Sequence, residues 1–154
     1  MKVLFLDIDG VVNSLRTCHA YGNYPHNVDE EQLKLFDHTA LKLIRNICNA
    51  YDIKIVLSSC WRNCKEFVDM PKALDLPIID KTPQKLSSIR GEEIQMWLRE
   101  HPEVTQYVIV DDDSDMLPTQ RKRFVRTDRQ EGLSFKNYRK ICKLFGVPEF
   151  IKGL

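Results

Sequence analysis

The sequence predicts a single-domain α/β protein with a Rossmann-like, three-layer architecture, in which helices cover both faces of a parallel sheet. Short apolar runs alternate with segments whose apolar residues recur at helical spacing, and this alternation is typical of a parallel sheet. The chain has 154 residues, a length that suits one domain with a core of its own. We therefore expect one domain over residues 1–154.

Five apolar runs predict the strands of this sheet. A strand buried on both faces of a parallel sheet is continuously apolar rather than alternating. We expect the first strand to lie at the centre of the sheet, between the second and the fourth. The third run gives the weakest strand signal. The expected strands are Val3–Leu6, Ile53–Leu57, Pro77–Ile79, Tyr107–Val110 and Phe124–Thr127.

The region between the first two strands holds two different kinds of segment. From Leu33 to Cys48 the apolar spacing fits one helix or two, because Asp29 and Asp37 are both suitable N-caps. Residues 14–28 are polar and follow an acidic turn. A plain surface loop and a flap over the neighbouring site are both open interpretations of them, and the segment is too short for a large cap domain.

Three further helices are expected in the rest of the chain. A short helix should end at Pro71, because proline limits a helix. A longer helix that contains Trp97 should begin at Ser88 as its N-cap. The last helix should begin after Ser134 and stop at Gly146.

The composition excludes several classes of protein. A hydrophobic fraction of 43% and a charged fraction of 29% indicate a folded protein rather than a disordered chain. The net charge of +1 gives no global electrostatic case for nucleic acid. The basic stretch Arg121–Arg129 is interpreted first as a solvated face, with a local binding patch as the alternative.

The five cysteines are odd in number and irregular in spacing, so we expect reduced thiols in a cytoplasmic protein. Cys60 and Cys64 lack a second pair at zinc-like spacing. No apolar run approaches the roughly 20 residues that span a bilayer, and the N-terminus does not resemble a signal peptide. We expect no membrane association and take a monomer as the default.

Polar side chains follow three of the expected strands and precede one helix. In open parallel sheets ligands bind beyond the carboxyl ends of the strands, so these side chains should meet at one edge. Carboxylates from two strands suit Mg²⁺, and hydroxyls and cations complete a cradle for phosphate. The residues expected there are Asp7, Asp9, Ser58, Ser59, Arg62, Lys85, Arg90, Asp111, Asp112 and Asp113.

The motifs resemble those of haloacid dehalogenase-superfamily phosphatases. The run Asp7-Ile-Asp9-Gly-Val resembles the first motif, Ser58 after an apolar strand resembles the second, and Val108-Ile-Val-Asp-Asp resembles the fourth. Residues 9–13, 57–62, 90–98 and 127–134 are similar, more narrowly, to the small capless group named for the phosphatase domain of Swiss-army-knife RNA repair proteins.

The resemblance implies Mg²⁺-dependent hydrolysis of a phosphomonoester and the strand order 5-4-1-2-3. Asp7 would form an aspartyl-phosphate, and Asp9 would protonate the leaving alcohol and then activate water. Mg²⁺ would contact Asp7, the backbone carbonyl of Asp9, and Asp112. Ser58 and Arg90 would hold the phosphoryl oxygens.

Two positions of the resemblance stay open. The third motif usually supplies a lysine ahead of a helix, and here Arg90 is favoured over Lys85, with Lys81 as a further rival. In the fourth motif Asp112 is favoured for the metal and Asp111 is next, although Asp113 follows directly.

Other residues near these motifs have plainer interpretations. Ser59 is equally suited to binding substrate and to capping the turn that follows it. For Arg62 a surface salt bridge is favoured slightly over contact with a substrate phosphate. Trp61 and Trp97 are interpreted as packing groups rather than stacking platforms for bases.

Three kinds of substrate fit an open phosphatase site: a polynucleotide 3′-phosphate end, a small phosphometabolite and a phosphoprotein. The resemblance favours the first, whereas the near-zero net charge does not. Two alternatives from other classes are a receiver-like signalling domain and a catalytically silent binding module. The pairing of Asp7 with Asp9 argues against both.

Overall fold

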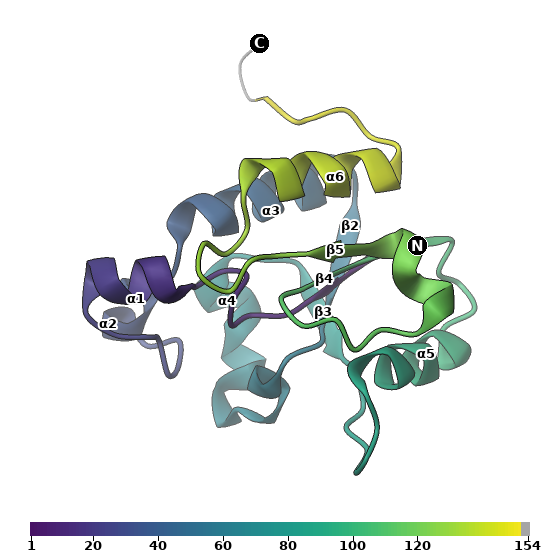
Figure 1. Cartoon of the computed structure of the whole chain (residues 1–154), viewed down its shortest axis with the longest axis horizontal. Helices are drawn as coiled ribbons and strands as arrows, with labels where there is room; N and C mark the ends of the chain where they lie inside the picture. The colour runs from purple at the N-terminus through teal and green to yellow at the C-terminus, as the bar shows by residue number, and fades with distance from the viewer. Residues whose placement is uncertain (152–154) are drawn as a thin grey trace.

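A computed structural model describes residues 1–151 and contains a five-stranded sheet whose strands are all parallel. The order is β3-β2-β1-β4-β5, which confirms the expected order read from the other edge (Figure 1). The strands are β1 (Lys2–Leu6), β2 (Ile53–Leu57), β3 (Ile78–Lys81), β4 (Gln106–Asp111) and β5 (Phe124–Arg126).

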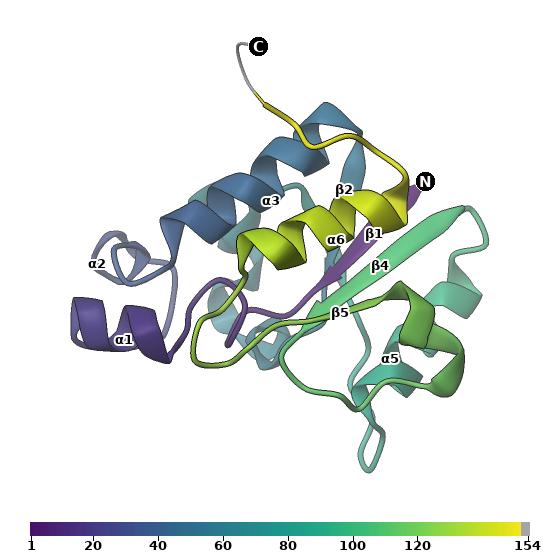
Figure 2. The same ribbon diagram turned by 45° about the horizontal axis from the view of Figure 1, so that its top comes forward.

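Helices cover both faces of the sheet, as the three-layer prediction requires. Helices α3 (His38–Ala50) and α6 (Phe135–Phe145) lie side by side on one face, and α5 (Arg90–Glu100) lies on the other (Figures 1 and 2). Alternate residues of β1 supply the two cores, because successive strand residues point to opposite faces. Leu4 belongs to the core under α3 and α6, and Phe5 to the core under α5.

Short helices complete the described chain. None of the helices in residues 1–151 combines the length and the apolar character needed to cross a bilayer. The α-helices are α1 (Leu15–Tyr21), α2 (Glu30–Leu33) and α4 (Met70–Leu74), and the 3₁₀ turns are η1 (Cys60–Asn63), η2 (Lys65–Asp69) and η3 (Pro118–Arg123).

The register of the central strands brings three strand ends to one level. Leu6 pairs with Leu57 of β2 and with Val110 of β4. The backbone N–H of Asp7 donates to Val110 O at 3.0 Å, and that of Ser58 donates to Leu6 O at 2.9 Å. The residues that follow β1, β2 and β4 therefore lie at the same edge of the sheet.

The region after β1 is more helical than its sequence pattern indicates. Asp29 and Asp37 each cap a separate helix, so the two-helix alternative is right. Residues 15–21 form a helix where a loop or flap was expected. Ser14 and Thr17 bond to each other's backbone N–H at 3.2 and 2.9 Å, and this reciprocal cap stabilises a polar helix that apolar spacing does not reveal.

Two of the expected helix boundaries are wrong and one helix is confirmed. Pro71 lies in the first turn of α4, where a missing N–H is tolerated, rather than at a helix end. Ser88 does not cap α5, because its hydroxyl donates to Lys85 O instead. Ser134 caps α6 as expected, and Gly146 ends it with a φ of 68°.

Candidate active site

Asp7 is the first residue after β1 and is buried at the edge of the sheet. Burial removes water from its carboxylate and raises its pKa to about 7, against the lowering effects of the Arg90 charge and of the Ile8 N–H. A buried carboxylate with this pKa needs a nearby positive charge to stay ionised. The charge of Arg90 lowers the pKa only part of the way, so a further positive charge would be needed to hold Asp7 fully ionised at neutral pH.

Three carboxylates meet at this point. Asp7, Asp111 and Asp112 each offer an oxygen, and these oxygens lie within 4.8 Å of one another. Asp111 is almost fully buried, and burial, followed by the charge of Asp7, raises its pKa to about 9. Its Oδ1 accepts a hydrogen bond from the N–H of Asp113, whereas its Oδ2 accepts no hydrogen bond from any group in residues 1–151.

The chemistry of this donor set fits Mg²⁺. Carboxylate oxygens are the ligands that a small hard cation prefers. A cation would also partner the buried Oδ2 of Asp111 and offset the mutual repulsion of the three carboxylates. Both favoured residues of the fourth motif belong to the cluster, whereas Asp113 is exposed and lies outside it.

Gly10 explains why a glycine follows the two aspartates of the first motif. Its φ is +79°, and a Cβ at this position would lie 2.4 Å from Oδ2 of Asp112. Only a residue without a side chain lets the β1 loop and the β4 loop approach this closely. The Thr127 hydroxyl donates to Gly10 O at 2.7 Å and holds the loop from the other side.

Asp9 lies outside the acidic cluster, and its side chain is exposed. The indole N–H of Trp61 donates to both of its oxygens, at 3.1 and 3.2 Å, and the Asn13 amide donates to Oδ1 at 2.9 Å. Asn13 in turn accepts from the N–H of Gly10 at 3.2 Å. Two fixed donors therefore orient a carboxylate that remains open to solvent.

Trp61 is a packing group, as expected, and also a hydrogen-bond donor to the site. It is buried and packs edge-to-face on Phe36, with ring centroids 5.7 Å apart. Ser59, one residue before η1, accepts from the N–H of Trp61 at 3.3 Å and also lines the cavity beside Asp7. The capping role of Ser59 thus fixes the turn that presents Trp61 to Asp9.

Ser58 and Arg90 carry buried polar atoms that have no partner in the described chain, residues 1–151. These atoms are the hydroxyl of Ser58 and Nη1 of Arg90. Arg90 opens α5, and its Nε lies 3.7 Å from Oδ2 of Asp111. Its backbone N–H donates to the Asp115 carboxylate at 3.0 Å, which joins the start of α5 to the loop after β4.

The remaining cations expected at the site lie elsewhere in this structure. Lys85 is exposed and lines a separate cavity on α5. Arg62 forms an ion pair with Glu93 at 2.9 Å, and both side chains are buried rather than on the surface. Lys81 donates to Arg62 O at 2.8 Å and lies over the ring of Phe67. Arg90 is the third-motif candidate that faces the acidic cluster.

A cavity of about 460 Å³ is lined by the acidic cluster, Asp9, Ser59 and Arg90, whereas Ser58 and Trp61 are not among its lining residues. Asp7, Asp9 and Arg90 line it together with Arg129, whose Nε lies 2.8 Å from Oδ2 of Asp112. Its remaining wall includes residues 24–26, so part of the expected flap segment adjoins the site.

Sequence reasoning missed three residues of this site: Asn13, Trp61 as a donor, and Arg129. Asn13 and Trp61 lie inside the motif segments 9–13 and 57–62, but spacing alone does not show that they meet at Asp9. Arg129 was assigned to the basic stretch as a solvated residue, and it contacts Asp112 while most of its side chain stays exposed.

A protein-family model described as the HAD domain in Swiss Army Knife RNA repair proteins matches residues 3–138. The chain belongs to this family. No curated protein and no solved structure matches the chain. The part matched as a HAD domain begins at the second residue of β1, contains the other four strands and α5, and ends within α6. Membership of the HAD family indicates hydrolysis of the phosphatase type.

Proposed function

We propose that this HAD domain is a Mg²⁺-dependent phosphomonoester hydrolase that forms an aspartyl-phosphate on Asp7. The observation that carries the proposal is a set of unpaired buried atoms. Four buried side-chain polar atoms in residues 1–151 lack a hydrogen-bond partner, and three of them belong to Ser58, Arg90 and Asp111. Buried polar groups are nearly always hydrogen-bonded, so a ligand is expected here. The Ser58 hydroxyl and the Arg90 guanidinium can donate to an anion, and the Asp111 carboxylate can bind a cation.

The cation would be held by Asp7, Asp111 and Asp112, with the backbone carbonyl of Asp9 as a further ligand. When bound, Mg²⁺ would neutralise the carboxylates and the phosphoryl oxygens that meet at this point. This requirement explains why the fold places three acidic side chains together although two of them are buried.

The first half of the reaction is displacement at phosphorus. A carboxylate oxygen of Asp7 forms a bond to phosphorus, and the bond from phosphorus to the ester oxygen breaks. Arg90 and Ser58 donate hydrogen bonds to the non-bridging oxygens, and the unpaired Nη1 and hydroxyl are the atoms available to do so. Asp9 gives its proton to the departing alcohol oxygen.

The second half restores the enzyme. Asp9, now a carboxylate, takes a proton from water, and the water oxygen bonds to phosphorus as the bond to Asp7 breaks. Inorganic phosphate leaves and Asp9 is protonated again. The hydrogen bonds from Trp61 and Asn13 hold the Asp9 carboxylate in one orientation for both transfers.

For the substrate we favour a polynucleotide 3′-phosphate end. The family occurs in RNA repair proteins by its description, and no inserted cap domain covers the cavity in residues 1–151. The exposed Arg129 stands at the cavity wall, where a strand would enter. A small phosphometabolite and a phosphoprotein are the competing substrates.

The test of the activity is hydrolysis of an aryl phosphate with Mg²⁺ and with excess chelator, by the native protein and by Asp7→Asn. We expect turnover only with the metal and the native residue, because an amide cannot form the aspartyl-phosphate. Asp52→Asn is the matched control, since Asp52 is an exposed aspartate just before β2, away from the strand ends that form the site. Equal turnover by Asp7→Asn would refute the proposal.

The substrate is tested with a panel of a 3′-phosphorylated oligonucleotide, a sugar phosphate and a phosphopeptide. We expect the highest kcat/KM on the oligonucleotide. A higher value on either competitor would replace the proposed substrate while leaving the proposed chemistry intact.

A further inference from the structure

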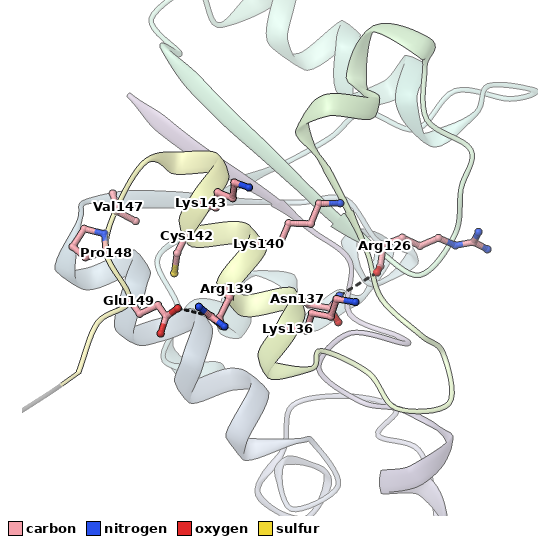
Figure 3. A pocket seen from close by; sticks show the side chains of 10 residues that line it. All are labelled: Arg126, Lys136, Asn137, Arg139, Lys140, Cys142, Lys143, Val147, Pro148 and Glu149. Atoms are coloured by element: carbon pink, nitrogen blue, oxygen red, sulfur yellow. Dashed lines mark hydrogen bonds and ion pairs between the residues drawn. The ribbon is translucent and has the colours of Figure 1, made fainter.

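A second cavity is larger than the catalytic one. A groove of about 910 Å³ lies along α6, with residues 147–149 on one side of the helix and Arg126 on the other (Figure 3). Its charged lining residues are five cations and one acid. They are Arg126, Lys136, Arg139, Lys140, Lys143 and Glu149.

Most of these cations are not neutralised. Arg139 forms an ion pair with Glu149, and Figure 3 shows this pair on one side of α6 while Lys140 extends toward the side of Arg126. Within residues 1–151, neither Arg126 nor any of the three lysines lies within 4.0 Å of a carboxylate. The groove therefore offers four free positive charges.

The three lysines follow helical spacing. Lys136, Lys140 and Lys143 are four and three residues apart, so they lie on one face of α6. At a rise of 1.5 Å per residue they are separated by about 6 and about 4.5 Å along the helix axis. All three are exposed. A row of separate cations suits a ligand with repeated negative charges better than it suits a single small anion.

The groove and the catalytic cavity are separate, and both adjoin a third cavity. A middle cavity shares Arg126 with the groove and shares Asp112, Asp113 and Arg129 with the active site. The guanidinium Nε of Arg126 donates to Asp112 O at 3.1 Å, and Asn137 of α6 donates to Arg126 O at 3.3 Å. Two hydrogen bonds, both made by Arg126, thus connect the backbone of Asp112 to the first turn of α6.

We propose that the α6 groove binds the sugar-phosphate backbone of a single-stranded nucleic acid, whose terminal phosphate lies at Asp7. The placement of that terminal phosphate rests on the proposed function. Grooves that track single strands combine positive charge with room for several nucleotides. The chain has a net charge of only +1. The positive charge of the groove is therefore concentrated at this place and does not reflect a basic protein as a whole. The middle cavity, which a strand must pass, places Arg126 and Arg129 beside Asp112, Asp113 and Asp128, and Arg129 is paired with Asp112.

The experiment measures equilibrium binding of a fluorescent single-stranded RNA of about 12 nucleotides that ends in a 3′-hydroxyl. Binding is detected by fluorescence anisotropy at several salt concentrations. The test variant replaces all three groove lysines: Lys136→Gln, Lys140→Gln and Lys143→Gln. The matched control removes the same charge from exposed lysines on other elements: Lys42→Gln, Lys65→Gln and Lys72→Gln. Because this RNA has no phosphate to release, its binding is measured whether or not the protein is a phosphatase.

Neutralised phosphates set the salt dependence of such binding, with a slope of about −0.7 for each one on single strands. Four groove cations give a slope of log K against log salt of about −3, and the groove variant should reduce it to about −1. We expect at least a tenfold loss of affinity in the groove variant and little loss in the control.

Three results would overturn the proposal. They are equal losses in the two triple variants, an unchanged salt slope in the groove variant, and equal affinity for a polyglutamate peptide, which would make the groove a site for acidic protein segments. Far-ultraviolet circular dichroism and thermal unfolding of both variants establish that each is folded.

Discussion

Trp61→Phe separates the two roles of this tryptophan in one substitution. Phenylalanine keeps an aromatic ring against Phe36 but loses the indole N–H that donates to Asp9 at 3.1 and 3.2 Å. The second donor to Asp9, the amide of Asn13, stays in place. The variant should therefore loosen the orientation of Asp9 without removing its carboxylate.

The expected magnitude follows from the exposure of Asp9. A hydrogen bond to a charged group contributes about 1.5–3 kcal/mol, but water replaces part of it at an exposed carboxylate. We therefore expect a loss of about 1 kcal/mol in transition-state stabilisation, or about fivefold in kcat/KM. The loss should be larger for an alkyl phosphate than for an aryl phosphate, because only the alkoxide strongly needs a proton from Asp9.

Trp97→Phe is the matched control. Trp97 is also buried, packs edge-to-face on Phe5, and donates its indole N–H to the Asp80 carboxylate at 2.7 Å. Both variants lose similar volume and an indole N–H that donates to a carboxylate, and each should lower the free energy of unfolding by about 1–2 kcal/mol. The assay is the ratio of kcat/KM values for the two esters. Identical ratios in the two variants would refute the positioning role of Trp61.

Three further predictions concern the charged groups of the site. Asp9→Asn should lower kcat/KM by about 10²–10⁴-fold on an alkyl phosphate and less on an aryl phosphate, measured by phosphate release. Arg90→Lys should retain more activity than Arg90→Ala, which should lose about 10²–10³-fold, and equal rates would remove Arg90 from phosphate binding. Burial raises the pKa of Asp7 to about 7 and that of Asp111 to about 9. Both values lie above the unfolded value of about 3.9, so without metal these two carboxylates bind protons more tightly in the folded protein than in the unfolded chain. The protein's thermal stability in chelator should be highest near pH 4 and fall as the pH rises through 7 toward 9; a Tm that rises over this range would contradict the assignment.

The strands and their order were predictable because burial on both faces leaves a simple apolar signature. β1 and β2 match their predicted ends closely. The meeting of Asp7 with Asp111 follows from the parallel register, which places the ends of β1 and β4 at one level. The acidic cluster was therefore derivable from the sequence without any knowledge of individual contacts.

Contacts made by loops were not predictable in the same way. The hydrogen bond from Trp61 to Asp9 joins two loops 52 residues apart and depends on the packing of Trp61 against Phe36. Arg62, one residue later, lies in a buried ion pair with Glu93 of α5. Spacing in the sequence carries no information on which neighbour a loop side chain meets.

Helix boundaries differed where side chains found tertiary partners. The Ser88 hydroxyl bonds to Lys85 O and to Glu93 Oε1 rather than to the free N–H groups of α5. The helix at 15–21 was missed because its stability comes from a reciprocal cap between Ser14 and Thr17 rather than from an apolar stripe. A reciprocal cap of this kind marks the start of a short polar helix that apolar spacing does not reveal.

The most direct measurement of the central claim is detection of a phosphoryl group on Asp7 during turnover. The native protein is mixed with Mg²⁺ and an aryl phosphate, quenched in acid after a fraction of one turnover, and treated with borohydride, which reduces an aspartyl-phosphate to homoserine. Mass spectrometry of the peptide that contains residues 3–16 should then show homoserine at position 7, and no homoserine in the Asp7→Asn protein. Steady release of phosphate with no modification of Asp7 at any quench time would contradict the mechanism.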